Sequence, residues 1–151
     1  MRFDFDDINL IPKKCIVDSR SECDTSVTLG EHKFRLPIVP ANMECVLDTE
    51  LAKNLSKRGY FYILHRFYED AVIIAFLNNM NKDGLVTSIS LGVNKDSYEL
   101  IDKILNYELN VDFITIDIAH GHSIKMEKML KHLKEKMPNT FLIAGNVSTV
   151  E

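Results

Sequence analysis

Short apolar runs rich in β-branched and aromatic residues recur along the chain at nearly regular intervals. Their starts lie 25, 26, 26 and 28 residues apart. Each run has the length of a buried strand in a parallel sheet. We therefore expect strands at residues 36–39, 61–64, 87–90, 113–116 and 141–144.

The segments between these runs carry apolar residues at the 3.6-residue spacing of amphipathic helices. Good N-cap residues and helix-ending glycine or proline residues bound several of these segments. We expect four helices: from Asp48 to Gly59, from about 69 to 84, around Tyr98, Ile101 and Leu105, and from Ser123 to Pro138. The second is expected to bury Val72, Ile73, Phe76 and Met80.

Strands that alternate with helices predict a parallel sheet covered by helices. An open doubly wound sheet and a closed eight-stranded barrel both fit this spacing. The first strand-to-helix turn has no G-x-G-x-x-G sequence, which argues against a dinucleotide-binding open sheet. A barrel needs about 250 residues, so this chain of 151 would form roughly half of one.

A different pattern precedes the first repeat. Residues 25–29 and 33–35 have the composition of two strands, and 30–32 the composition of a hairpin turn. No linker or change in composition divides the chain. We expect a single domain over residues 1–151, with a preamble and hairpin at 1–35 and the strand–helix repeats at 36–151.

Composition narrows the class of protein. A net charge of −4 with scattered basic residues argues against nucleic acid as the main partner. No apolar run reaches the roughly 20 residues that span a membrane, and the first ten residues do not have the pattern of a signal peptide. Cys15, Cys23 and Cys45 have no metal-binding spacing, so we interpret them as passive, reduced thiols of a cytoplasmic protein.

Candidate chemistry lies at the carboxyl ends of the expected strands, which meet at one edge of a parallel sheet. The most specific segment is 117–122, where Asp117 is followed by His120, Gly121 and His122. One hypothesis is a metal site formed by both histidines with Asp117 and His65. A second is a tight turn at Gly121 with histidines bonded to neighbouring loops. A third makes Asp117 a hydrogen-bond acceptor for a ligand.

Arg66 follows another of these strands. Its guanidinium could contact a phosphate or a nicotinamide ribose, or form a salt bridge with Glu69 or Asp70. No glycine-rich phosphate loop occurs in the sequence. Cys45 is the cysteine nearest to this edge.

Six segments resemble successive motifs of the IMP dehydrogenase/GMP reductase family. They are DFDDINLIP, VDSRSECDTSVTL, LPIVPANM, ILHRF, ITIDIAHGHS and IAGNVST, in the family's order and over nearly the whole chain. The resemblance implies a (βα)8 TIM barrel, truncated here after about the fifth strand and preceded by a β-hairpin. Members of the family are usually homo-tetramers.

The wording of these motifs is most similar to the bacterial GMP reductase branch. Many IMP dehydrogenases insert a regulatory pair of small domains after the second strand, and here Arg66 is followed at once by the helix starting near Glu69. Three alternatives stay open: an IMP dehydrogenase without the insert, a metal-dependent barrel hydrolase and an inert fragment.

The resemblance implies NADPH-dependent reductive deamination of GMP to IMP and ammonia, in which a cysteine thiolate attacks the purine. The implied NADPH contacts are Asp117, Ala119, His120, Arg66, Ser19 and Arg20, the last two reaching a neighbouring subunit; the implied substrate contacts are Asn42, Met43 and Asn146. The family's cysteine, phosphate loops and potassium loop have no counterpart in this sequence. We therefore expect no catalytic or metal-binding residue here, and no activity without the remaining half of the barrel.

Overall fold

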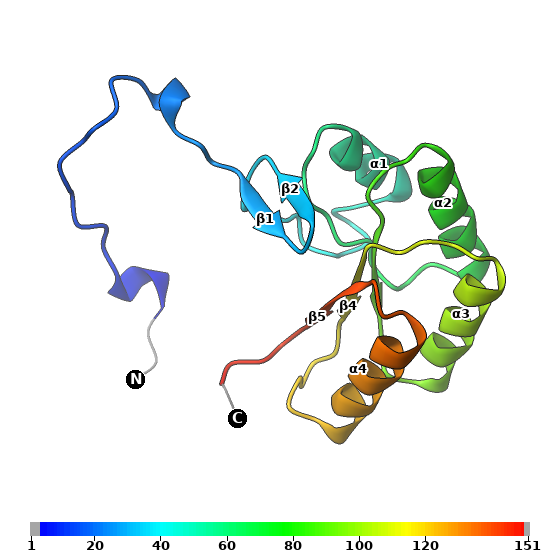
Figure 1. The fold of residues 1–151 in the computed structure, drawn as a ribbon. Helices are drawn as coiled ribbons and strands as arrows, with labels where there is room; N and C mark the ends of the chain where they lie inside the picture. Colours follow the sequence, from blue (N-terminus) through cyan, green and yellow to red (C-terminus); the bar gives the residue numbers. More distant parts are fainter. Residues whose placement is uncertain (1–3, 150–151) are drawn as a thin grey trace.

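The computed structural model describes residues 4–149 as an N-terminal arm, a β-hairpin and a parallel sheet with helices along one side (Figure 1). The arm contains two short 3-10 turns, η1 (Phe5–Asp7) and η2 (Arg20–Glu22). The hairpin consists of β1 (Val27–Leu29) and β2 (His32–Phe34). Helices α1 (Thr49–Lys57), α2 (Asp70–Lys82), α3 (Lys95–Asn106) and α4 (Ile124–Lys136) follow one another in an arc.

Local signals set the helix boundaries. The Asp48 carboxylate accepts the Leu51 N–H at 2.7 Å, and the Ser123 hydroxyl accepts the Met126 N–H at 3.2 Å, so α1 and α4 begin where the sequence predicts. Gly59, at φ +74°, and Gly84, at φ +62°, adopt the left-handed conformation just beyond α1 and α2. All four expected helices are present.

The sheet contains β3 (Ser88–Leu91), β4 (Phe113–Ile116) and β5 (Phe141–Ala144), all parallel and in sequence order. Leu64 extends the sheet by one bridge to Ile89: its N–H donates to the Ser88 carbonyl at 3.1 Å. Consecutive strand order with helices on one side is the arrangement of one part of a (βα) barrel, but residues 4–149 form an open sheet and no closed barrel.

The first two expected strands need correction. Residues 36–39 form no strand, and of residues 61–64 only Leu64 is bridged. Pro37 and Pro40 have no N–H to donate to a neighbouring strand. Ile38 is 65% exposed and Val39 is 42% exposed, so neighbours within residues 4–149 cover these two side chains only in part. A strand requires a hydrogen-bonded partner, and residues 36–39 pair with no strand in the part of the chain that the structure describes.

The predicted hairpin is confirmed, with a shorter first strand and a second strand that begins one residue earlier. Val27 pairs with Phe34 and Leu29 with His32, around a turn at Gly30, whose φ of +57° suits glycine. Phe34 packs with Phe61 and Phe113 in a small cluster of buried rings. Because Phe113 is the first residue of β4, the hairpin covers the amino end of the sheet, opposite the strand ends that carry the candidate chemistry.

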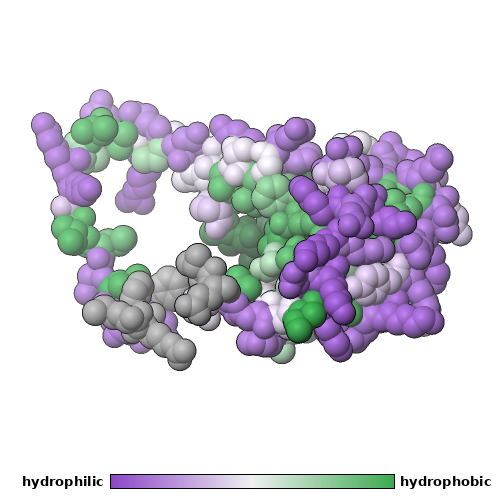
Figure 2. Space-filling view, turned by 60° about the horizontal axis from the view of Figure 1, so that its bottom comes forward, coloured by the Kyte–Doolittle hydropathy of each residue, from purple (hydrophilic) through white to green (hydrophobic). Residues whose placement is uncertain are grey.

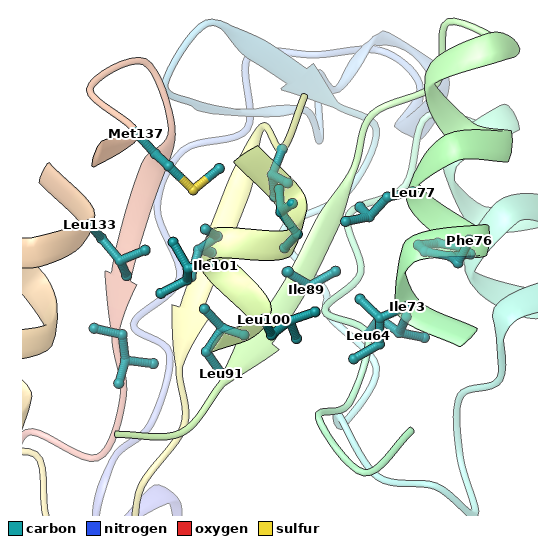
Figure 3. Packing of buried hydrophobic residues seen from close by; sticks show 14 of the residues in the cluster. Leu64, Ile73, Phe76, Leu77, Ile89, Leu91, Leu100, Ile101, Leu133 and Met137 are labelled. Carbon is teal, nitrogen blue, oxygen red and sulfur yellow. The ribbon is translucent and has the colours of Figure 1, made fainter. Parts of the chain in front are cut away.

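The main core lies between the sheet and the helices, where side chains from both point toward one another (Figure 3). Ile73, Phe76, Leu77 and Met80 form the buried stripe of α2. Val72, expected in this stripe, is 40% exposed. Successive helical residues are about 100° apart, so a stripe centred on Ile73 and Leu77 turns Val72 toward solvent.

Polar and apolar surfaces are separated. Figure 2 shows hydrophilic residues over much of the helical side and apolar surface near the middle of the molecule, beside the arm. No helix within residues 4–149 combines the length and the apolar character that a membrane crossing requires.

Candidate functional site at the carboxyl ends of the strands

Asp117 is the centre of a polar cluster at the strand ends. It follows β4, and its N–H donates to the Leu91 carbonyl of β3 at 2.8 Å, which fixes its backbone. Its Oδ2 accepts a hydrogen bond from Asn42 Nδ2 at 3.0 Å and lies 4.0 Å from Arg66 Nε. The fold thus brings together three side chains from distant parts of the sequence.

Both charged members of this cluster are accessible. The side chains of Arg66 and Asp117 are 37% and 32% exposed, and a contact of 4.0 Å at that exposure is weak. The guanidinium also lies 4.9 Å from the centre of the Phe67 ring. The salt-bridge hypothesis proposed Glu69 or Asp70 as the partner of Arg66, whereas within residues 4–149 Arg66 pairs with Asp117, and Asp70 pairs with Lys103 at 2.6 Å.

The cluster offers complementary hydrogen-bonding groups to a ligand. Asp117 Oδ1 accepts no hydrogen bond from residues 4–149, so one carboxylate oxygen can take an amide or hydroxyl proton. Arg66 presents several N–H donors and a positive charge. A ligand with an N–H or O–H donor near an anionic group would match both.

The loop after β4 and the loop after β5 approach each other closely next to this cluster. The Gly121 N–H donates to the Asn146 carbonyl at 3.1 Å, and the Gly145 N–H donates to the Ile116 carbonyl at 3.0 Å. A Cβ on Gly121 would lie 2.4 Å from the Gly145 oxygen and 2.6 Å from Val147 Cγ1. Asn146 adopts φ +55°. Only glycine fits at 121 without moving a loop.

The histidines of this segment do not converge on a metal-ligand set. The rings of His120 and His122 lie 6.1 Å apart at the surface, and His122 Nε2 is 3.4 Å from the Thr149 hydroxyl. His65 is 1% exposed. Within residues 4–149 no three His, Cys, Asp or Glu side chains form a group that could hold a metal ion. The geometry favours the tight-turn interpretation of this segment.

The structure places the other predicted residues at different distances from the cluster. Ala119 and His120 are exposed in the loop after Asp117, and Asn146 is exposed on the adjacent loop. Met43 is 52% exposed and follows Asn42. The resemblance implied a substrate contact for Asn42, and in the structure its amide donates a hydrogen bond to Asp117.

Ser19 and Arg20 lie elsewhere, in the arm. They are exposed, and the Ser19 hydroxyl caps η2 by accepting the Ser21 N–H at 3.3 Å. The arm extends away from the sheet (Figure 1), so the structure does not bring these two residues to Asp117. Cys45, like Cys15 and Cys23, is an exposed free thiol.

Two further residues lie next to Arg66 in the structure. Gly92 lies beside Arg66: a Cβ there would be 3.6 Å from Arg66 Nη1. His65 accepts a hydrogen bond from the backbone of Phe67, next to Arg66. Gly92 is marked in the sequence by its place directly after an expected strand. His65 was considered as a metal ligand, and the structure instead shows its Nδ1 accepting a backbone N–H.

A parallel sheet with helices on one side and a polar cluster at its carboxyl ends defines a class of α/β proteins that bind ligands at this edge. Residues 2–151 match the IMP dehydrogenase / GMP reductase domain, and the chain belongs to this family. It is 55% identical over 149 residues to a GMP reductase of Lysinibacillus sphaericus, 54% to one of Clostridium acetobutylicum and 52% to one of Enterococcus faecalis. These matches cover 99% of this chain and 45%, 45% and 46% of the relatives.

The chain therefore spans less than half the length of these relatives. Experiments on a longer protein can use a chimera. In it, residues 1–151 of this chain are followed by the part of the Lysinibacillus sphaericus relative that lies C-terminal to the matched residues. We refer to it below as the chimera.

Substituting Gly121 should destabilise the chimera. In Gly121→Ala the methyl group would collide with the Gly145 oxygen, and overpacking of this kind costs about 1–3 kcal/mol. Gly92→Ala is the matched control, because its nearest contacts, at 3.4 and 3.6 Å, are side-chain atoms. Thermal unfolding of both variants checks this. Equal melting temperatures for Gly121→Ala and the unmodified chimera would contradict the loop contact.

Proposed function

We propose that this chain supplies the N-terminal part of a GMP reductase, an enzyme that converts GMP to IMP and ammonia with NADPH as reductant. The observation that carries the proposal is the 52–55% identity, over 149 residues, to relatives named GMP reductase. The strand-end cluster supports it, because this edge of a parallel sheet is where such folds bind nucleotides. In this proposal the open sheet is part of a TIM barrel, completed by residues beyond those matched here.

The groups around Asp117 fit the nicotinamide end of NADPH. The unengaged carboxylate oxygen suits the carboxamide N–H₂ of the cofactor, and Arg66 suits its negatively charged ribose-phosphate portion. Backbone groups of Ala119 and His120, exposed in the next loop, lie on the same side. NADPH, when bound, would supply the hydride; the residues of this chain would orient the ring and hold it at the sheet edge.

The substrate would lie across Asn42, Met43 and Asn146. The Asn42 amide is shared with Asp117, so one hydrogen bond would connect the purine side of the site with the cofactor side. Ser19 and Arg20, in the extended arm, would reach the NADPH of a neighbouring subunit in a cytoplasmic homo-tetramer. Potassium, if required, would be bound by residues outside this chain.

Purified alone, the chain should show no GMP-dependent oxidation of NADPH. None of its three cysteines lies at the nucleophile's place in the family pattern, and without a thiolate the purine cannot be activated by covalent attack. The loss of NADPH absorbance with GMP present measures this directly. Turnover by the isolated chain would contradict the prediction, and its disappearance in Cys45→Ala would identify Cys45 as the nucleophile.

A further inference from the structure

His65 is a buried histidine beside the site, and its two ring nitrogens are used unequally. It follows Leu64, which is bridged to Ile89 of β3, and precedes Arg66. His65 is 1% exposed. Its Nδ1 accepts a hydrogen bond from the backbone N–H of Phe67 at 3.3 Å. An accepting Nδ1 carries no proton, so the ring is neutral and its proton is on Nε2.

The Nε2–H group is buried and has no hydrogen-bond partner among residues 4–149. A buried donor without an acceptor is unfavourable. Phenylalanine at this position would keep the ring stacked on Tyr68, 4.3 Å between centroids, and would remove the unpaired donor. Among residues 4–149, the contact that is specific to histidine is therefore the one made by Nδ1.

Nδ1 holds the turn that presents Arg66. The Phe67 side chain is 62% exposed, so burial does not fix it. Its ring nevertheless lies 4.9 Å from the Arg66 guanidinium, whose Nε is 4.0 Å from Asp117 Oδ2. Anchoring the Phe67 amide fixes the backbone of the turn from which Arg66 and Phe67 project, and with it the direction in which Arg66 leaves the backbone.

We propose that His65 is a positioning residue for cofactor binding: its Nδ1 holds the Phe67 N–H so that Arg66 faces Asp117 and the anionic part of the nucleotide. His65 itself does not touch the ligand. The identity of the ligand as NADPH rests on the function proposed above. The claim that His65 positions Arg66 is independent of that function.

Two variants of the chimera separate positioning from packing. His65→Phe keeps a ring and lacks the acceptor, whereas the side-chain oxygen of His65→Asn lies close to the place of Nδ1 and can accept the same hydrogen bond. We expect His65→Phe to raise KM for NADPH about tenfold, equivalent to about 1.4 kcal/mol, with KM for GMP nearly unchanged. Its melting temperature should be equal or higher. His65→Asn should restore most of the NADPH affinity.

An unchanged KM for NADPH in His65→Phe would overturn the proposal. Equal losses in the Phe and Asn variants, each with a lowered melting temperature, would also overturn it, since His65 would then act through packing. Nitrogen-15 NMR spectra of the His65 ring test whether Nδ1 accepts the Phe67 N–H, and they need no activity assay. A protonated Nδ1 would exclude this hydrogen bond.

Failure of the proposed function is distinguishable from failure of this inference. A folded chimera without GMP-dependent NADPH oxidation contradicts the function. In that protein the NMR resonance of the Arg66 Nε–H group still reports the position of the Arg66 side chain. A shift of this resonance in His65→Phe but not in His65→Asn supports positioning, and no shift in either variant overturns it.

Discussion

Purified alone, the chain should self-associate at micromolar concentrations. Within residues 4–149, β5 pairs only with β4, so its outer edge presents unpaired backbone N–H and C=O groups. Phe141 at the start of β5 is 40% exposed. The first expected strand, residues 36–39, is likewise unpaired, and Ile38 is 65% exposed. Open edges flanked by apolar side chains favour pairing with another chain.

Apolar surface on the middle of the molecule strengthens this expectation (Figure 2). Co-expression with the remaining part of the Lysinibacillus sphaericus relative should cover both edges and yield a soluble, uniform complex. Sedimentation or light scattering of the two preparations makes the comparison. A monodisperse monomer of the chain alone, unfolding cooperatively at high micromolar concentration, would show that the open sheet is self-sufficient and would contradict the barrel proposal.

Replacing Asp117 by alanine in the chimera should impair the use of NADPH far more than it impairs folding. The carboxylate is 32% exposed and follows its strand, so its contribution to the core is small. Loss of a polar ligand contact costs about 1–3 kcal/mol, which is about 5- to 150-fold in KM for NADPH. Steady-state kinetics and thermal unfolding of the same preparation measure the two effects.

Asp112, at the other end of the same strand, provides the control. Its carboxylate accepts the N–H and hydroxyl of the buried Thr87 at 2.7 and 2.9 Å and the Asn110 amide at 2.9 Å. Asp112→Ala should therefore lower the free energy of unfolding by about 1–3 kcal/mol and leave KM for NADPH nearly unchanged. Should Asp117→Ala instead lose stability and keep its kinetics, Asp117 would be a structural residue.

Helices were predictable because their signals are local. Asp48 and Ser123 cap α1 and α4 through residues three positions away, and the periodicity of α2 is contained in its own sequence. Strand pairing depends on distant neighbours. An apolar run at 36–39 therefore predicted a strand that the structure does not form.

In the candidate site, too, local features were predictable from the sequence and contacts between distant residues were not. That polar residues gather at strand ends is a property of parallel α/β topology, so Asp117 and Arg66 could be singled out from the sequence. The hydrogen bond from Asn42 to Asp117 joins residues 75 positions apart, and no local pattern encodes it. The role of His65 depends on which ring nitrogen meets the Phe67 amide, which only the folded turn decides.

The most direct test of the central claim is the rate of NADPH oxidation by the purified chimera, with and without GMP. The account predicts oxidation that requires GMP and releases IMP and ammonia, and it predicts no reduction of NAD⁺ with IMP as substrate. A correctly folded chimera that reduces NAD⁺ with IMP, and leaves NADPH unchanged in the presence of GMP, would contradict it.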